Sequence, residues 1–220
     1  MLICLGLTLW VSCKKDDGTV IDEPAATTTS TTTGNPLPKD TVEKIIEIKT
    51  AFGTMYMWLQ KETPKHRTNF LTLAEEGFFD GTTFHRCVAD FVIQGGDPNT
   101  KDTDTSNDGS GGPGYKIPAE INIQKLKHVY GAVGAARDNN PLKESNGSQF
   151  YIVLPKAGTP NLNGNYTVFG KILGGMQYAD SIVKQPQNAS NRPYENIYMD
   201  VNVVEKTRQE LRTQFSFEAN

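Results

Sequence analysis

The sequence predicts a mainly β protein whose strands close into an antiparallel barrel capped by two helices. Three features predict it: short apolar runs alternate with polar residues, Gly- and Asn-rich turns separate these runs, and only two segments have helical spacing. Closure is favoured because a barrel leaves no strand edge exposed to pairing with other chains. The 220 residues suffice for one medium-sized domain with appendages.

Composition and charge exclude several classes of protein. Hydrophobic residues make up 37% and charged residues 21% of the chain, which excludes collagen, a long coiled coil and a wholly disordered chain. The net charge of −3 supplies no overall basic field, so we expect no nucleic-acid partner. The sequence contains no run of 18 apolar residues, which argues against an ordinary membrane-spanning helix.

Residues 1–13 resemble the signal peptide of a bacterial lipoprotein. A short apolar stretch, MLICLGLTLWVS, ends in a small residue directly before Cys13, and two lysines and two aspartates follow. In such a signal the cysteine thiol is acylated, so Cys13 is the expected site of lipid attachment. Two features depart from the pattern, because Trp10 replaces the usual leucine and no basic residue precedes the apolar stretch. The alternative is an apolar N-terminus that is not cleaved.

A threonine-rich linker is expected over residues 14–41. Its composition, with TTTSTTT at 27–33, cannot bury enough apolar surface to offset the entropy of ordering. A flexible coil of these 28 residues has an r.m.s. span of about 30 Å. Such a tether would hold a domain at residues 42–206 clear of a membrane in the cell envelope, with the outer membrane as the expected site and a periplasmic or surface-facing orientation. A polar tail, 207–220, is expected to be loosely ordered.

Within the domain the expected elements follow one another closely. Residues 44–49 alternate in polarity, and a second strand at 55–59 follows a Phe-Gly-Thr turn, so the two are expected to form a hairpin. A helix opens at Thr63-Pro64, with the threonine as N-cap, and ends at Gly77. A second helix is expected near 176–183. The remaining strands are expected at about 83–88, 91–95, 129–136, 149–154, 166–172 and 197–205.

Two of these strands carry polar residues that a barrel core would not accommodate. Strand alternation puts Phe84 and Arg86 on one face, and it also puts Val92 and Gln94 on one face. Because arginine and glutamine are costly to bury, this face is predicted to line a groove. The segment 146–152 repeats the pattern, with a glutamine and a tyrosine on one face.

Five sequence blocks together resemble the cyclophilin family of peptidyl-prolyl cis-trans isomerases. They follow the family's order and lie within residues 44–206. The blocks are FHR (84–86), FVIQGGD (91–97), GSGGPGY (109–115), NGSQFYIV (146–153) and LNGNYTVFGKI (162–172). The resemblance implies an eight-stranded antiparallel barrel capped by two α-helices. It also implies acceleration of Xaa–Pro bond rotation. Together with the signal-like N-terminus, this predicts an isomerase that assists the folding of exported proteins.

The resemblance implies a role for each groove residue. Arg86 matches the catalytic arginine, Gln94 matches the residue that orients the substrate carbonyl, and Gln149 supports the groove. The apolar floor and walls that accept the proline ring match Phe91, Val92, Tyr151 and Leu162. The rest of the substrate-binding set comprises Ala136 and Arg137, which match the strand holding the residue before proline, and Tyr166, where many members have His.

Bond rotation needs no nucleophile, proton transfer or metal, so no cofactor or metal is expected. A donor aimed at the prolyl nitrogen localises its lone pair, and a guanidinium suits this because it stays charged and presents several donors. Two departures bear on detail: Asn161 stands where many members have tryptophan, and the loop 98–109 is longer than usual. That loop is expected to lie beside the far pocket of the groove and to alter sequence preference.

The sequence leaves one alternative function open. The alternative to the enzyme is a noncatalytic module on the same fold that binds Pro-containing peptides; either would have proline-containing polypeptides as partners and is expected to be monomeric. A hydrolase is disfavoured because no Ser-His-Asp or Cys-His arrangement can be placed in the sequence. Cys87 is interpreted as a small buried hydrophobe.

Overall fold

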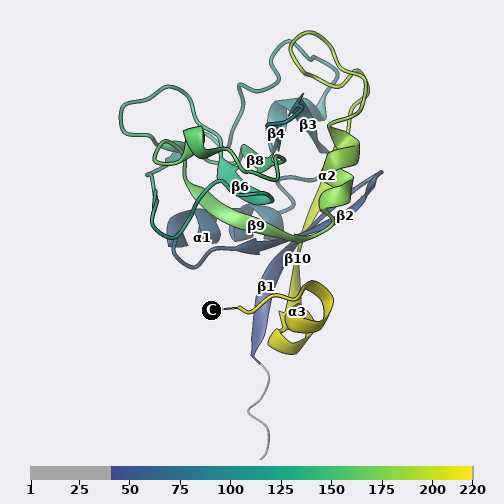
Figure 1. Cartoon of the computed structure of the whole chain (residues 1–220). Coiled ribbons are helices and arrows are strands. Elements are labelled where there is room, and N and C mark those ends of the chain that lie inside the picture. The colour runs from purple at the N-terminus through teal and green to yellow at the C-terminus, as the bar shows by residue number, and fades with distance from the viewer. Residues whose placement is uncertain (1–40, 220) are drawn as a thin grey trace, which may run out of the picture. The chain divides into compact units, whose positions relative to one another are not determined.

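Eight strands hydrogen-bond into a closed antiparallel barrel in the order β1-β10-β3-β4-β8-β6-β9-β2 (Figure 1). The computed structural model describes residues 41–219, all of which belong to one compact unit that begins at residue 38. The predicted closed barrel is therefore confirmed. The expected signal peptide, with Cys13, and all but the last residue of the expected linker lie outside the described residues.

The elements of the described chain lie close to the positions expected from the sequence. The barrel strands are β1 (Val42–Thr50), β2 (Gly53–Leu59), β3 (Thr82–Val88), β4 (Val92–Gly95), β6 (Ala132–Ala135), β8 (Phe150–Val153), β9 (Val168–Gly174) and β10 (Tyr198–Thr207). A separate two-stranded sheet pairs β5 (Lys116–Ile117) with β7 (Ser145–Asn146). The helices are α1 (Pro64–Glu75), α2 (Met176–Ile182) and α3 (Arg208–Phe215), with 3₁₀ turns at Pro98–Lys101 and Pro160–Leu162. No described helix has the length and apolar character needed to cross a bilayer.

Large apolar side chains from the strands and from two helices fill the barrel interior. Ile46 and Ile48 of β1 alternate inward, and α1 and α2 add Phe70 and Ile182 to the same core. Phe70 stacks on Phe79 with ring centroids 4.6 Å apart. Burial in this core holds α1 and α2 to the barrel, because each helix contributes apolar side chains that would otherwise face water.

Strand β3 departs from the alternation that its sequence predicts. Phe84 pairs with Gly95 and Arg86 pairs with Gln94, so one extra residue, His85, is inserted opposite β4 as a β-bulge. Phe84 consequently lies in the barrel core, whereas Arg86 faces the outer surface. The prediction that Phe84 and Arg86 share a face is wrong, because a bulge reverses side-chain direction along the strand.

The N-terminus of α1 is capped from a distant part of the chain. Thr63, the expected cap, makes no side-chain hydrogen bond to the helix. Instead, the Glu120 carboxylate accepts hydrogen bonds from the backbone N–H of Lys65 at 3.1 Å and of His66 at 3.0 Å. An anionic cap at this end also complements the helix dipole.

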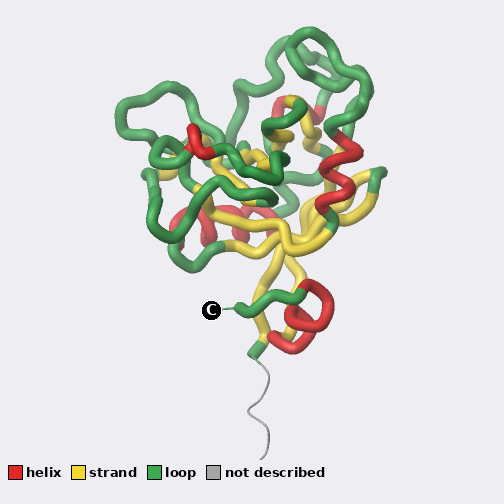
Figure 2. Tube along the Cα trace, in the orientation of Figure 1, coloured by secondary structure: helices red, strands yellow, loops and turns green. Residues whose placement is uncertain are grey.

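The C-terminal segment is ordered, contrary to the expectation of a loose polar tail. Thr207 and Glu210 form a capping box, each side chain accepting a hydrogen bond from the other residue's backbone N–H, and α3 follows. Figure 2 shows this third helix in red beside the ends of β1 and β10. Leu211 is fully buried against the outer surface of the barrel, and Phe217 lies 5.1 Å from the ring of Trp58. The expectation was wrong because the apolar residues in this segment are few and widely spaced.

We predict that Leu211→Ala lowers the free energy of unfolding by about 3 kcal/mol, since it removes a fully buried side chain and leaves a cavity. Leu142→Ala is the control, because Leu142 is 73% exposed and its truncation should change stability by less than about 0.5 kcal/mol. Urea unfolding followed by circular dichroism measures both. Equal midpoints for the two variants would contradict the packing role of α3.

Candidate active site

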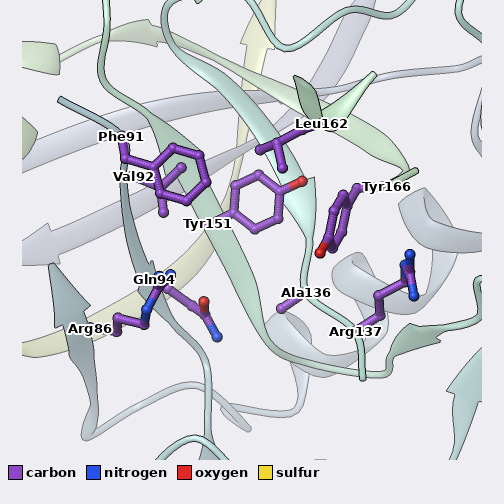
Figure 3. Close-up of a pocket in the computed structure, with 9 residues that line it drawn as sticks. All are labelled: Arg86, Phe91, Val92, Gln94, Ala136, Arg137, Tyr151, Leu162 and Tyr166. Atoms are coloured by element: carbon purple, nitrogen blue, oxygen red, sulfur yellow. The ribbon is translucent and has the colours of Figure 1, made fainter. Parts of the chain in front are cut away.

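The polar groove residues share one register row across four barrel strands. Arg86 of β3 pairs with Gln94 of β4, Gln94 pairs with Tyr151 of β8, and Tyr151 pairs with Gly134 of β6. Residues in one row of an antiparallel sheet point to the same face, so these three side chains leave the barrel on its outer surface. Figure 3 shows them around a common hollow.

A cavity of about 260 Å³ lies over this row. Its lining comprises Arg86, Phe91, Val92, Gln94, Ala136, Arg137, Tyr151, Leu162 and Tyr166. The structure thus brings together all the predicted groove residues except Gln149. That residue lies beside Gln94 and lines a neighbouring cavity of about 310 Å³, which shares Gln94, Ala136 and Arg137 with the first. The end of the long loop and the residue after it supply Gly109 and Ser110 to this second cavity.

The floor of the first cavity belongs to an apolar cluster that is separate from the barrel core. Val92, Tyr151 and Leu162 are buried members of this cluster, and Phe91 and Tyr166 pack against it from the rim. An apolar floor bounded by aromatic edges can hold a small apolar ring and shield it from water.

Tyr151 is held in place by a buried histidine. The Tyr151 hydroxyl lies 2.8 Å from Nε2 of His128, and Nδ1 of His128 lies 2.9 Å from Oδ1 of Asn163. Because the amide oxygen can only accept, we assign the proton to Nδ1, and the tyrosine hydroxyl then donates to Nε2. Burial lowers the pKa of His128 and raises the pKa of Tyr151 well above its ordinary value, so both side chains are neutral at pH 7.

Gly134 provides the space that the Tyr151 ring occupies. A Cβ atom on residue 134 would lie 2.4 Å from the tyrosine hydroxyl oxygen, which is far inside van der Waals contact. The sequence pattern did not mark Gly134, His128 and Asn163 as parts of the site. A glycine at a strand position is the one local signal that could have indicated a close approach.

Arg86 stands at one edge of the cavity without an acidic partner. Its guanidinium carbon lies 5.9 Å from the centroid of the Phe91 ring, which orients the side chain without occupying its donors. No ion pair joins Arg86 to any residue between 41 and 219. The N–H groups of Arg86 are therefore available to a ligand in the cavity.

The opposite edge is built by Arg137 and Tyr166. The guanidinium carbon of Arg137 lies 4.8 Å from the Tyr166 ring centroid, and the side chain donates to the backbone oxygens of Asn165 and Asp138. Tyr166 in turn meets Tyr151 edge-on, with centroids 6.0 Å apart. Arg137 therefore serves as a fixed wall, since two of its donors and the face of its guanidinium are engaged within the chain.

The described residues offer no other group suited to covalent or metal chemistry at this cavity. Between 41 and 219 there is no group of three or more His, Cys, Asp or Glu side chains that could hold a metal ion. Cys87 is buried in the barrel, and burial raises the pKa of its thiol to about 12, so it is not a thiolate at neutral pH.

A Ser-His-Glu arrangement, in which Glu120 takes the place of the aspartate in a Ser-His-Asp set, lies elsewhere in the fold. His66 contacts the Ser145 hydroxyl through Nε2 at 3.0 Å and the Glu120 carboxylate through Nδ1 at 2.7 Å. The geometry resembles a hydrolase triad. However, Ser145 is 1% exposed, and the adjoining cavity that His66 lines has a volume of only about 10 Å³. No substrate can reach the hydroxyl, so the arrangement is structural: it ties α1 to β7.

Comparison with known proteins identifies the family. The model of the cyclophilin-type peptidyl-prolyl cis-trans isomerase family matches residues 45–203. This chain is a cyclophilin. It is 38% identical over 151 residues to the peptidyl-prolyl cis-trans isomerase ppi1 of Schizosaccharomyces pombe. The aligned region covers 68% of this chain and 92% of that protein. Peptidyl-prolyl cis-trans isomerase B of Bacillus subtilis is 43% identical over 114 residues, or 52% of this chain and 71% of that protein.

A solved structure agrees with this assignment. The cyclophilin-type isomerase of Cryptosporidium parvum, crystallised in the presence of the dipeptide Ala-Pro, is 31% identical to this chain with a TM-score of 0.64. The match covers 73% of this chain and 98% of that one. The chain is therefore a peptidyl-prolyl cis-trans isomerase, and its fold is one that binds proline-containing peptides.

The buried histidine beside Tyr151 predicts a pH dependence of stability. Burial lowers the pKa of His128 in the folded cyclophilin below the 6.5 of the unfolded chain. The stability that the neutral ring contributes is therefore fully present above pH 6.5 and is lost as pH falls below it toward the folded pKa, with a slope of at most about 1.4 kcal/mol per pH unit. The free energy of unfolding, measured in urea at pH 7.5 and at pH 5.5, should differ less between the two pH values for His128→Gln than for the wild type. An equal difference would contradict the buried, neutral state of His128.

Proposed function

We propose that this cyclophilin isomerises Xaa–Pro bonds in exported proteins at the cell envelope and thereby assists their folding, with Arg86 as its catalytic residue. One observation carries the role of Arg86: a guanidinium without an acidic partner among the described residues stands at the edge of an apolar cavity. The pairing of a free donor with an apolar floor suits a prolyl ring whose nitrogen must be polarised.

The chemical task is to lower a rotational barrier. The barrier of about 18–20 kcal/mol arises from the partial double bond between carbonyl carbon and nitrogen. As the bond twists, the nitrogen becomes pyramidal and its lone pair can accept a hydrogen bond. A donor from Arg86 directed at this nitrogen is bound more strongly in the twisted state than in the planar one, and it therefore accelerates rotation.

The magnitudes are compatible with this chemistry. Uncatalysed exchange takes tens to hundreds of seconds, so a turnover of about 10 per second needs about three decades of acceleration. Three decades correspond to about 4 kcal/mol. One or two preorganised, charge-assisted hydrogen bonds in a partly dry groove supply an energy of this size.

The remaining cavity residues bind and orient the substrate in this proposal. The proline ring rests on Phe91, Val92, Tyr151 and Leu162. Gln94 directs the substrate carbonyl, with Gln149 behind it. The residue before proline lies along Ala136 and Arg137, beside Tyr166. This arrangement holds the residues on either side of the Xaa–Pro bond in place while Arg86 acts on the prolyl nitrogen.

Attachment to a membrane is the second half of the proposal. Cys13 would be acylated, and the threonine-rich linker would leave the isomerase free to meet chains as they emerge in the envelope. The support comes from the sequence: an apolar stretch ends at a small residue directly before Cys13, and a sharp polar change follows. Several acyl chains on one cysteine would anchor the protein stably, whereas one chain is marginal.

We predict that Arg86→Ala lowers kcat/KM for an Xaa-Pro peptide by about 10²–10³-fold, because it removes the donor that acts on the transition state. Arg212→Ala is a matched control, since Arg212 lies on the exposed surface of α3 and its loss should leave the rate unchanged. Peptide binding and the circular dichroism spectrum should survive in both variants. Full activity in Arg86→Ala would refute the catalytic role, and a wild type that binds peptide without isomerising it would favour the noncatalytic module.

For the anchor we predict that wild-type cells incorporate radiolabelled palmitate into the protein, whereas Cys13→Ala abolishes labelling, because the thiol that carries the lipid is gone. Cys87→Ala is the control, since the buried Cys87 should not be acylated. Palmitate in Cys13→Ala at the wild-type level would exclude this mode of anchoring without affecting the isomerase assignment.

A further inference from the structure

The orientation of two groove glutamines is fixed by the long loop that follows β4. Nε2 of Gln149 donates to the backbone oxygens of Gly109 and Gly111 at 3.0 and 2.8 Å. If the amide group of Gln149 were reversed, its oxygen would face these two backbone oxygens without a proton between them. Nε2 must therefore face the loop, and Oε1 must face away from it. There it accepts a hydrogen bond from Nε2 of Gln94 at 3.0 Å. The loop backbone thereby sets which end of the Gln94 amide meets the cavity.

That loop is in turn held by a carboxylate with no exposure to solvent. Asp97 is 0% exposed. Its Oδ2 accepts from the backbone N–H of Gly109 at 2.5 Å and of Gly111 at 3.0 Å, and its Oδ1 accepts from the backbone N–H of Asn99 at 2.8 Å. Oδ2 also lies 3.4 Å from Nε2 of Gln149. Charge-assisted bonds to several N–H groups are among the stronger interactions available to a buried carboxylate.

The packing around Asp97 leaves no room for a side chain at residue 111. A Cβ atom on residue 111 would lie only 2.2 Å from Oδ1 of Asp97, so glycine is required where the loop returns to the barrel. Asp97 and Gly111 therefore close the base of the long loop, and the contact is close enough for a single methyl group to displace the carboxylate.

We propose that Asp97 is a positioning residue for isomerisation, which acts through Gly109, Gly111 and Gln149 to hold the Gln94 amide toward the substrate. The inference rests on the isomerase activity of the cyclophilin and deepens it. Asp97 touches no substrate, because it lies behind Gln149 and lines neither cavity. Its carboxylate holds the backbone of Gly109 and Gly111, and the oxygens of that backbone in turn orient Gln149.

A second buried carboxylate in the same loop serves as a natural control. Oδ2 of Asp108 pairs with Nε of Arg192 at 2.6 Å, and both side chains are largely buried. This ion pair ties the loop to the segment before β10, but neither partner hydrogen-bonds to Gln149 or Gln94. Asp108→Asn should weaken the loop without turning the glutamines.

The test is a double-mutant cycle on kcat/KM for an Xaa-Pro peptide, with the full-length chain in detergent. Asp97→Asn should lower kcat/KM about tenfold, because an amide nitrogen now faces a loop N–H and the displaced loop releases Gln149. In a Gln94→Ala background the same substitution should change kcat/KM less than about twofold, since the group that it positions is absent. Asp108→Asn should leave kcat/KM within about twofold of the wild type while it lowers the melting temperature.

Gly111→Ala provides an independent variant that keeps every polar group and displaces Asp97 sterically. Gly111→Ala should lower kcat/KM as Asp97→Asn does, and this loss should likewise shrink in the Gln94→Ala background. If Asp97→Asn does not fold, Gly111→Ala alone tests the proposal. Losses that are additive with Gln94→Ala, or an equal loss in Asp108→Asn, would show that general loop integrity matters instead and would overturn the proposal. Activity in the wild type with no effect of either variant would also overturn it, whereas an inactive wild type would refute the isomerase function itself.

Discussion

The groove depends on the β-bulge at His85. Without the extra residue, strict alternation would put either both Phe84 and Arg86 or neither on the outer face of β3. The bulge instead sends the phenylalanine into the core and the arginine outward, in register with Gln94 and Tyr151. A single inserted residue thus lets positions two residues apart on one strand face opposite sides, one toward the hydrophobic core and one toward the functional surface, which is a recurrent use of bulges next to active sites.

The sequence alone predicted the parts of this fold that follow from local pattern. Alternation and turn residues located the barrel strands, helical spacing located the first two helices, and the resemblance to a known family indicated the residues that line the cavity. Pattern failed where an interaction joins distant segments. Glu120 caps α1 from 54 residues away, and no local feature marks it. The Thr207–Glu210 capping box was a readable signal for α3, but burial of Leu211 against the barrel was not. The β3 bulge was not predicted either, because a bulge is defined by the pairing with β4, and the consecutive polar residues His85 and Arg86 do not reveal that pairing.

Buried polar groups around the cavity are arranged in linked sets rather than as isolated pairs. His128 and Asn163 hold Tyr151 from one side, while Gln149 holds Gln94 from the other. Each linked group satisfies donors that would be costly to leave unpaired in a low-dielectric surrounding. The same bonds that stabilise the fold therefore also remove the rotational freedom of the side chains that face the substrate. Preorganisation of the groove is a consequence of satisfying its buried polar atoms.

Rate and stability consequently depend on different ionisable groups. The proposed catalytic group is the guanidinium of Arg86, and bond rotation transfers no proton. The groups whose pKa values are lowered by burial, His66, His85 and His128, lie in the supporting structure. Acidification should therefore act first on the fraction of folded molecules, while the rate per folded molecule stays nearly constant. A bell-shaped dependence of that rate on pH would require a titrating acid or base at the reacting bond, and the cavity lining of this cyclophilin presents only arginines and tyrosines as ionisable side chains.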